Sequence, residues 1–255
     1  MPALWRYRTL VKNLVLRDLK LKYRGSALGV LWSLLNPLLL LSVYTVAFRH
    51  VLRVPVEDYP FFLLAGLLPW NFFAGAALAS TSAIVSNGAL LRKVSFPCEA
   101  LPVGRVLFAF VQLALALAAF LPAFLVFSRV TLRPAAALYA LVLLFHVLFT
   151  IGVALLLSVL TVRWRDVAHL TEVALLLVFW LTPIVYPARL APPALARVFA
   201  VSPPAAFAIA YQDTLFSGRL PPRGVLVSIA LSTVASLVAG VLVLRSARAG
   251  LAEQV

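Results

Sequence analysis

Long apolar runs without a single charged side chain dominate this sequence. Five of them are long enough to cross a bilayer as helices, and a sixth is shorter but very apolar. A membrane-crossing helix needs about 20 mostly apolar residues, because no water inside the bilayer can satisfy exposed backbone groups. The six predicted spans are Ala27–Phe48, Tyr59–Leu91, Val106–Ser128, Pro134–Val162, Val173–Ala188 and Gly224–Leu244.

A seventh apolar stretch, Val198–Gln212, is shorter and is interrupted by Ser202-Pro203-Pro204. Proline lacks a backbone N–H and breaks helices, and the stretch has fewer residues than a span requires. We therefore expect a re-entrant or interfacial helix in a hairpin over residues 188–220, on the outer side between the fifth and sixth spans. The predicted fold class is an all-α integral membrane protein with six transmembrane helices in one domain, residues 1–255.

The composition agrees with that fold class and excludes others. Of the 255 residues, 64% are hydrophobic and 12% are charged, whereas an ordinary soluble domain has about 25% charged residues. One soluble core of this size cannot hide so much apolar mass, and a disordered basic tail would lack it. Cys98 is the only cysteine, which excludes an intrachain disulfide and a thiolate metal cluster. We expect this chain to bind no metal or cofactor of its own.

Lysine and arginine set the predicted orientation. An even number of spans puts both chain ends on one side of the membrane. If that side is cytoplasmic, it holds 14 of the 22 Lys and Arg residues, seven of them in the N-terminal segment, in agreement with the positive-inside rule. We therefore expect both termini in the cytoplasm. The net charge of +14 then serves membrane anchoring, and we expect no nucleic-acid partner.

Residues 5–25 combine a basic strip with an apolar face, as an amphipathic helix in the membrane interface does. On a helical wheel the strip is Arg6, Arg17, Lys20 and Arg24, and the apolar face beside it is Tyr7, Leu10, Leu14 and Leu21. The polar residues that we assign to this interface helix are Arg17, Asp18, Lys20, Lys22 and Arg24. The alternative is a basic tail that only orients the first span.

The sequence lacks the usual groups for energy coupling or catalysis. All eight acidic residues lie outside the charge-free windows, although ion-coupled carriers usually need an ionisable group near the midplane. His146 is the one ionisable side chain well inside a predicted span, and without an acidic partner it is more typical of a packed or hydrogen-bonded residue. There is no Gly-x-x-x-x-Gly-Lys-Ser/Thr loop, His-Glu-x-x-His motif or Gly-x-Ser-x-Gly turn. Any energy for transport must therefore come from another subunit.

Two cytoplasmic connections differ from simple linkers. Residues 88–102 contain a basic pair, Phe96 and prolines at 97 and 102, which suits a short helix with a rigid exit that a partner can push. Residues 163–169 are compact and charged. By composition alone, either connection also suits a solvated loop.

Four short sequence blocks follow one another along the chain between residues 17 and 187. They are Arg17-Asp-Leu-Lys through Trp32-Ser to Asn36-Pro37, Leu91-Arg-Lys-Val-Ser-Phe-Pro97, Arg165-Asp-Val-Ala-His-Leu170 and Leu181-Thr-Pro-Ile-Val-Tyr-Pro187. In order and spacing they resemble the membrane subunits of type-2 ABC exporters for cell-surface polysaccharides such as O-antigen, capsule and teichoic-acid chains. Residues 202–207 depart from that pattern, because the family commonly has an Asn-Pro pair there.

The resemblance implies a homodimer around a translocation channel in a bacterial inner membrane, carrying a lipid-linked polysaccharide. Two separate ATPase subunits would lie beneath it and would bind ATP and Mg²⁺. Residues 88–101, named the coupling segment here, would sit in a groove of the ATPase, with the interface helix beside it. The residues expected to contact the ATPase subunit are Arg92, Lys93, Phe96, Pro97 and Glu99.

Aromatic residues gather where the outer half of a channel would lie. Aromatic rings bind the C–H faces of sugars weakly, and weak repeated contacts suit a cargo that must slide. The rings expected to line the channel, named the aromatic set here, are Tyr44, Phe48, Trp70, Phe73, Phe179, Trp180, Tyr186 and Tyr211. The alternative is that these rings belong to an interfacial belt or face lipid. Trp180 and Tyr186 flank the prolines at 183 and 187, where a broken helix should face protein or water and not lipid.

Two other functions stay open. An exporter of drugs or small lipids has the same architecture. An ion-coupled secondary carrier, or an intramembrane enzyme centred on His146, belongs to another class and would work without an ATPase.

Overall fold

The computed structural model describes residues 7–25, 29–93, 96–127 and 135–254, and these form helices and connecting turns with no strand. The helices are α2 (Arg8–Tyr23), η1 (Gly29–Leu31), α3 (Trp32–Tyr44), η2 (Thr45–Val51), α4 (Tyr59–Thr81), η3 (Val85–Asn87), α5 (Gly88–Lys93), α6 (Ala100–Phe127), α7 (Ala135–Arg163), α8 (Val167–Leu181), η4 (Ala188–Leu190), α9 (Pro193–Val201), α10 (Pro203–Tyr211), η5 (Gln212–Phe216) and α11 (Arg223–Gln254). The predicted all-α fold class is confirmed.

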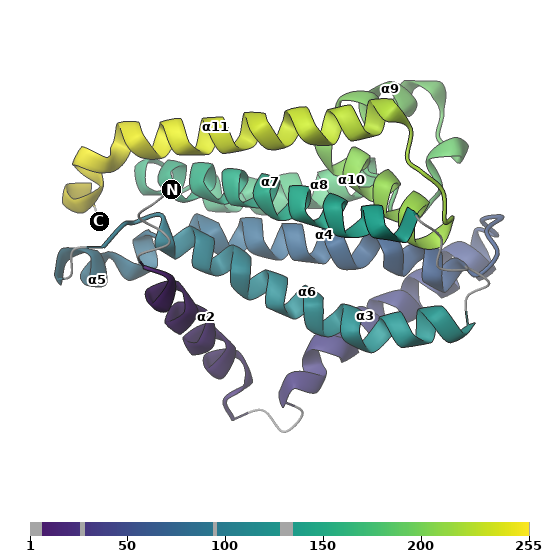
Figure 1. Ribbon diagram of the computed structural model, residues 1–255, viewed down its shortest axis with the longest axis horizontal. Coiled ribbons are helices and arrows are strands. Elements are labelled where there is room, and N and C mark those ends of the chain that lie inside the picture. The colour runs from purple at the N-terminus through teal and green to yellow at the C-terminus, as the bar shows by residue number, and fades with distance from the viewer. Residues whose placement is uncertain (1–6, 26–28, 94–95, 128–134, 255) are drawn as a thin grey trace.

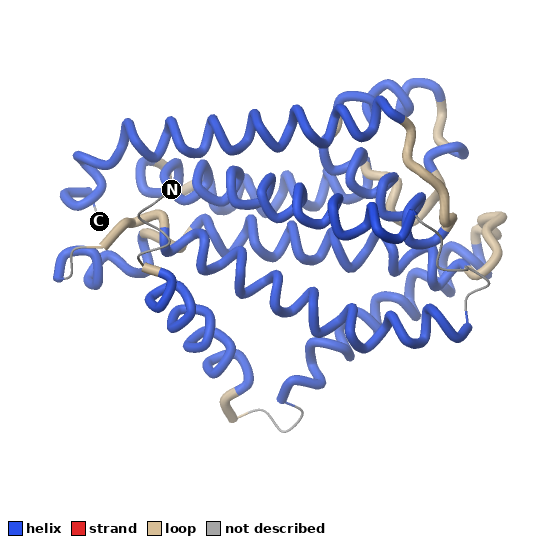
Figure 2. The backbone as a smooth tube through the Cα atoms, in the orientation of Figure 1, coloured by secondary structure: helices blue, strands red, loops and turns tan. Residues whose placement is uncertain are grey.

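The long helices run side by side along the long axis of the molecule (Figure 1). The most extensive contact joins α7 and α11, and α4 packs on both α6 and α7. The start of α2, helix α5 and the end of α11 lie at one end of this bundle, while α9 lies at the other (Figure 1). Turns and loops are confined largely to the two ends (Figure 2). This arrangement satisfies backbone groups within helices along the length that a bilayer would surround.

Five described helices are long and apolar enough to cross a membrane. They are Leu34–Val51, Tyr59–Thr81, Ala100–Pro122, Ala137–Arg163 and Arg223–Ala247. Each coincides with a predicted window. The second window was predicted to reach residue 91, but α4 ends ten residues earlier, because the chain turns at residues 82–87 before it enters α5.

The predicted fifth span is shorter than expected. Helix α8 has 15 residues, about 22 Å at the rise of an α-helix, which is less than the bilayer core of about 30 Å. It ends at Leu181, where the window continued to residue 188, because Thr182 and Pro183 leave the helical conformation. The next helices, α9 and α10, meet at Ser202 with a bend of 97°, which fits either a re-entrant hairpin or a broken span. The described residues therefore hold five helices of spanning length, or six if this bent pair is one span.

Helix α2 confirms the predicted N-terminal helix but corrects its apolar face. Its buried residues are Val11, Leu14, Val15 and Asp18, whereas Leu21 is 61% exposed. This i, i+3, i+4, i+7 stripe is the one that packs against α6. The predicted apolar face is therefore right at Leu14 and at the partly buried Leu10 and wrong at Leu21, because a helical wheel does not show the neighbouring helix. Arg6 lies outside the described residues.

Two glycines allow α7 and α11 to approach closely. A Cβ atom at Gly152 would lie 2.4 Å from the carbonyl carbon of Ser236, and one at Gly240 would lie 2.4 Å from the carbonyl oxygen of Gly152. The hydroxyl of Ser236 donates to the carbonyl of Phe149 across the same contact. Small residues and interhelical hydrogen bonds of this kind hold helices together in lipid.

Candidate coupling and translocation surfaces

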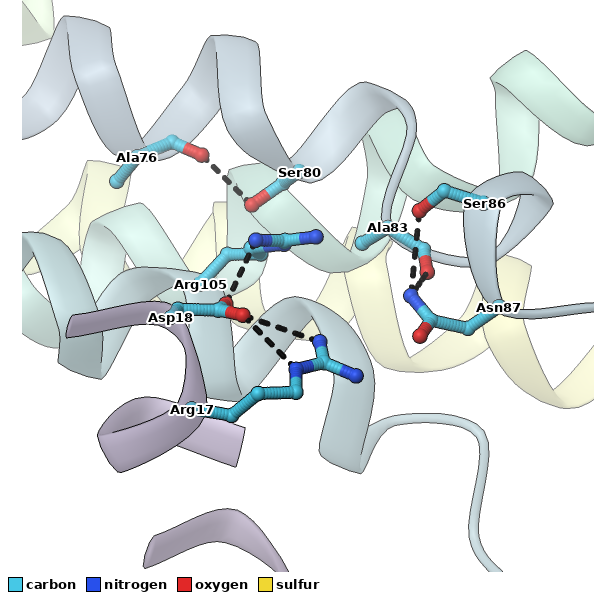
Figure 3. Close-up of polar contacts among 8 residues, drawn as sticks. All are labelled: Arg17, Asp18, Ala76, Ser80, Ala83, Ser86, Asn87 and Arg105. Carbon is cyan, nitrogen blue, oxygen red and sulfur yellow. Dashed lines mark hydrogen bonds and ion pairs between the residues drawn. The ribbon is translucent and has the colours of Figure 1, made fainter. Parts of the chain in front are cut away.

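The coupling segment begins with α5, which lies at the end of the bundle (Figure 1). The turn before it is fixed by Asn87, whose side-chain amide donates to the carbonyl of Ala83 at 2.9 Å and to the hydroxyl of Ser86 at 3.2 Å (Figure 3). Val85, Ser86 and Ala89 are exposed around this turn. The surface exposed at the start of the segment is therefore Ala89, beside the exposed turn that precedes α5.

The second half of the segment packs into the chain. Phe96 and Cys98 lie partly buried against a cluster, named the basal cluster here, of Leu14, Ala83, Ile84, Leu101, Leu155, Val159 and Leu244. Glu99, predicted to contact the ATPase, is only 8% exposed, and Pro97 is half-buried. The side chains of Arg92 and Lys93 lie outside the described residues. The segment is thus exposed at its start and packs further on against α2, α6, α7, α11 and the turn after α4.

An ion-pair node joins the interface helix to α6. The carboxylate of Asp18 accepts from Arg105 at 2.6 Å and from the adjacent Arg17 at 3.0 Å (Figure 3). Asp18 is 8% exposed, so two cations offset its burial. The sequence offered one signal for this node, a single carboxylate in a strongly basic helix, but gave no means to identify Arg105 as its partner.

Lys22 makes a different kind of contact. Its ammonium donates to the side-chain carbonyl of Gln112 and lies 5.8 Å from the ring centroid of Phe108. Burial lowers the pKa of Lys22 from its ordinary value. Lys22 is nevertheless exposed, as Lys20 and Arg24 are. Of the five polar residues predicted on the interface helix, Asp18 is the buried one, and Lys22 differs from the other cations because it reaches Gln112 of α6.

Most of the aromatic set forms one continuous series of ring contacts. Tyr44 stacks on Phe179 with centroids 5.8 Å apart, Phe179 contacts Trp70 at 5.7 Å, and Trp70 contacts Phe73 at 5.9 Å. Phe48 contacts Tyr44. The structure thus brings together rings from α3, η2, α4 and α8.

Burial separates the aromatic set into two groups. Trp70, Phe73, Phe179 and Tyr211 are at most 9% exposed and contact other parts of the same chain. The other four rings reach the surface: Trp180 is 48% exposed, and Tyr44, Phe48 and Tyr186 are half-buried. In this arrangement only the second group is available to a passing sugar.

The break after α8 is held by side chains from other elements. The side-chain amide of Gln212 donates to the carbonyl oxygens of Pro183, at 2.8 Å, and Ile184, at 3.3 Å. The hydroxyl of Tyr59 donates to the carbonyl of Val185 at 2.7 Å. The prediction that this broken backbone faces protein and not lipid is therefore confirmed for these carbonyls. Gln212 was not among the predicted functional residues. Its amide side chain at the end of an apolar stretch was the feature of the sequence that could have indicated a role.

His146 is a packed residue, as the sequence suggested. Its Nδ1 lies 3.1 Å from the hydroxyl oxygen of Tyr211, and its ring stacks on Phe207 with centroids 4.3 Å apart. Within the described part of the chain, no group of three His, Cys, Asp or Glu residues is arranged to hold a metal ion. The contacts of His146 join α7 to α10 and give it an anchoring role.

Comparisons with known proteins cover nearly the whole chain. A family profile described as "ABC-2 type transporter" matches residues 9–216. A Myxococcus xanthus protein named "O-antigen export system permease protein RfbA" is 34% identical over 254 residues, which cover 99% of this chain and 97% of that protein. A Klebsiella pneumoniae protein of the same name is 31% identical over 208 residues, 80% of this chain and 79% of that protein. The Escherichia coli "Polysialic acid transport protein KpsM" is 32% identical over 82 residues, 31% of this chain and 32% of that protein.

Proposed function

The chain belongs to the ABC-2 type transporter family, and on this premise we propose that it is the membrane subunit of an ATP-driven exporter of a lipid-linked, O-antigen-like polysaccharide. The observation that carries the proposal is similarity to an O-antigen export permease over 99% of the chain. The matched region includes the interface helix, the coupling segment and the broken fifth helix. The chain acts in a bacterial inner membrane.

The energy comes from a separate subunit. The sequence has no phosphate-binding loop, so two partner ATPase subunits bind ATP and Mg²⁺ and a homodimer of this chain forms the channel. The start of α2, helix α5 and the end of α11 share one end of the bundle (Figure 1), which supports a cytoplasmic location for both termini and for the coupling segment. An ATPase beneath that end would meet all three.

ATP-driven closure of the ATPase pair pushes on the exposed start of the coupling segment. The motion passes through Phe96 and Cys98 into the basal cluster, which contains Leu155 and Val159 of α7 and Leu244 of α11. Packed side chains transmit a displacement because interiors are nearly incompressible. The channel opens if the ATPase contacts differ between two arrangements of the spans.

The exported chain slides past aromatic rings at the surface of α3, η2, α8 and the turn after α8. Tyr44, Phe48, Trp180 and Tyr186 are the rings already exposed or half-buried, and they offer flat apolar faces to sugar C–H groups. The buried ring of Phe179 reaches the cargo only after α3 and α8 separate, which would open the stacked Tyr44–Phe179 pair.

The test is deletion of the gene in its own host and complementation with the wild-type chain. We expect the deletion strain to lose surface polysaccharide and to accumulate undelivered polysaccharide inside the cell. Complementation should restore the surface polysaccharide. Intact surface polysaccharide with new drug sensitivity would contradict the proposal and favour a drug exporter.

The coupling role needs variants that do not disturb packing. Phe96 and Glu99 are poor choices, because both side chains contact the bundle. Ala89→Arg places a bulky cation on the exposed face of α5, and Ala194→Arg makes the same change at an exposed position of α9, at the opposite end. We expect the first to abolish export and the second to leave it intact, with equal membrane levels of both. Equal export by the two variants would contradict the coupling role.

A further inference from the structure

A cavity of about 500 Å³ opens among α3, α4, α6 and α8 beside the end of the interface helix. Its polar lining comes from five elements, and its residues with a charged or amide group are Lys22, Asn36, Asn71, Arg105, Gln112 and Glu172. The volume lies within the range of about 300–1,000 Å³ that small-molecule sites occupy. None of the proposed coupling or sugar contacts uses this cavity.

The cavity wall changes from polar to apolar along α6. Arg105 lies near the start of α6, Gln112 follows seven residues later, and Leu113 and Ala116 continue the wall. Seven helical residues span about 10 Å, so Gln112 lies well inside the apolar stretch of this span. Leu40 and Leu68 face the same inner part from α3 and α4. A wall with this gradient matches an amphiphile, with a polar headgroup outside and an apolar chain inside.

Lys22 adds a positive charge to the cavity wall, and no described carboxylate forms an ion pair with it. Its contacts are the amide of Gln112 and the ring of Phe108, and no described carboxylate lies within 4.0 Å of its ammonium. Arg105, in contrast, already has Asp18 as its partner (Figure 3). Lys22 is exposed and also lines the cavity, so its ammonium can meet an anion that enters from the surface.

The acidic group of the cavity lies on another helix. Glu172 belongs to α8, is 68% exposed and lies 3.9 Å from His169. The negative charge of Glu172 repels an anion from the α8 side of the cavity. An anion would therefore bind on the opposite side, beside Lys22 and Gln112. Gln112 and Asn71 also carry amide N–H groups that can donate to phosphate oxygens.

We propose that this cavity binds the phosphate headgroup of a lipid, with Lys22 as the cation that pairs with the phosphate and with the apolar chain along Leu40, Leu68 and Leu113. Two lipids share this chemistry: the lipid end of the exported polysaccharide, which rests on the proposed function, and an anionic phospholipid of the bilayer. The first source makes the cavity the entrance for the cargo, and the second makes it a site that fixes the interface helix.

Binding of two phosphate lipids to the full chain tests the inference. The chain is purified with its ATPase subunits in phosphatidylethanolamine nanodiscs, without ATP, and titrated with a polyprenyl phosphate or with phosphatidylglycerol. The variants are Lys22→Gln, which removes the charge, and Gln112→Glu, which supplies a carboxylate to compete with the phosphate. The control is Lys20→Gln, an equal charge loss at another exposed lysine of the same helix, one that does not line the cavity. Circular dichroism checks that each variant keeps its helices.

We expect Lys22→Gln and Gln112→Glu to weaken binding at least about tenfold, the scale of one charge-assisted hydrogen bond, and Lys20→Gln to leave it nearly unchanged. Loss for polyprenyl phosphate alone identifies the cargo as the source, and equal loss for both probes identifies the bilayer. Unchanged binding in Lys22→Gln, or equal loss in Lys20→Gln, overturns the inference. Surface polysaccharide is measured in parallel and separates the two proposals. Absence of lipid binding with normal export would contradict the cavity proposal alone. Absence of export with normal lipid binding would contradict the proposed function alone.

Discussion

The close contact between α7 and α11 predicts that one added methyl group destabilises the protein. Gly152→Ala is the smallest such change. The new Cβ would lie 2.4 Å from the carbonyl carbon of Ser236 and 2.6 Å from the backbone nitrogen of Leu237, whereas carbon atoms rest at about 3.5–4.0 Å. These are backbone atoms and cannot rotate away. The helices must therefore separate by about 1 Å locally.

That separation has two consequences of similar size. The hydroxyls of Thr233 and Ser236 share their hydrogen between a nearer carbonyl of α11, Ile229 or Thr233, and the carbonyls of Phe145 and Phe149 at 3.3 and 3.2 Å. Both interhelical distances would pass 4 Å after a shift of about 1 Å, outside hydrogen-bond range. Each interhelical hydrogen bond in a membrane contributes about 0.6 kcal/mol. Overpacking adds about 1–3 kcal/mol. We expect Gly152→Ala to lower the free energy of unfolding by about 2–4 kcal/mol.

Unfolding in mixed detergent micelles, followed by circular dichroism, measures this change. Gly75→Ala is the matched control, because Gly75 also lies within a helix, α4, and nothing lies within 4 Å of its added Cβ. There the change should stabilise the protein by about 0.5–1 kcal/mol, since alanine restricts the unfolded chain. A Gly152→Ala protein as stable as the Gly75→Ala protein would refute the reasoning.

Three further predictions concern topology, the ion-pair node and the buried histidine. In a Cys98→Ser background, a membrane-impermeant thiol reagent should label Ser246→Cys only from the cytoplasmic side and Ser217→Cys only from the opposite side; labelling of both from one side would contradict the orientation. Asp18→Asn removes the carboxylate shared by two arginines, and a loss of about 1–3 kcal/mol should speed hydrogen exchange across α2, whereas unchanged exchange would show that the node does not hold the helix. Tyr211→Phe removes the hydrogen bond to the buried imidazole of His146 and should lower the free energy of unfolding by about 0.6 kcal/mol, while export continues. Loss of export without loss of stability would favour a catalytic or relay role for His146.

The spanning helices were predictable because lipid leaves the chain few choices. Any segment in the bilayer core must be apolar and must satisfy its own backbone, so charge-free windows located α3, α4, α6, α7 and α11 directly. The end of α8 was not predictable to the residue. Its backbone leaves the helix at Thr182, and the carbonyls released there are satisfied by Gln212 and Tyr59, which lie far away in the sequence.

The candidate site was predictable in its residue types but not in its exposure. The sequence named aromatic residues that the structure largely brings into contact, yet Phe73 and Tyr211 face the interior of the chain. A run of apolar residues contains no mark that distinguishes a buried face from a lipid-facing or channel-facing one. The same limit explains Leu21 and Asp18, since the burial of a helix face depends on the neighbour that covers it. Partners such as Arg105 and Gln112 could be found only from the packed structure.

The proposed export of polysaccharide with energy from a separate ATPase can be measured in vesicles. The purified chain is reconstituted with and without its ATPase subunits, and the arrival of a labelled lipid-linked polysaccharide on the other side is followed. We expect transfer only when the ATPase and hydrolysable ATP are both present. Transfer by the chain alone, or transfer that persists with a hydrolysis-defective ATPase, would contradict it.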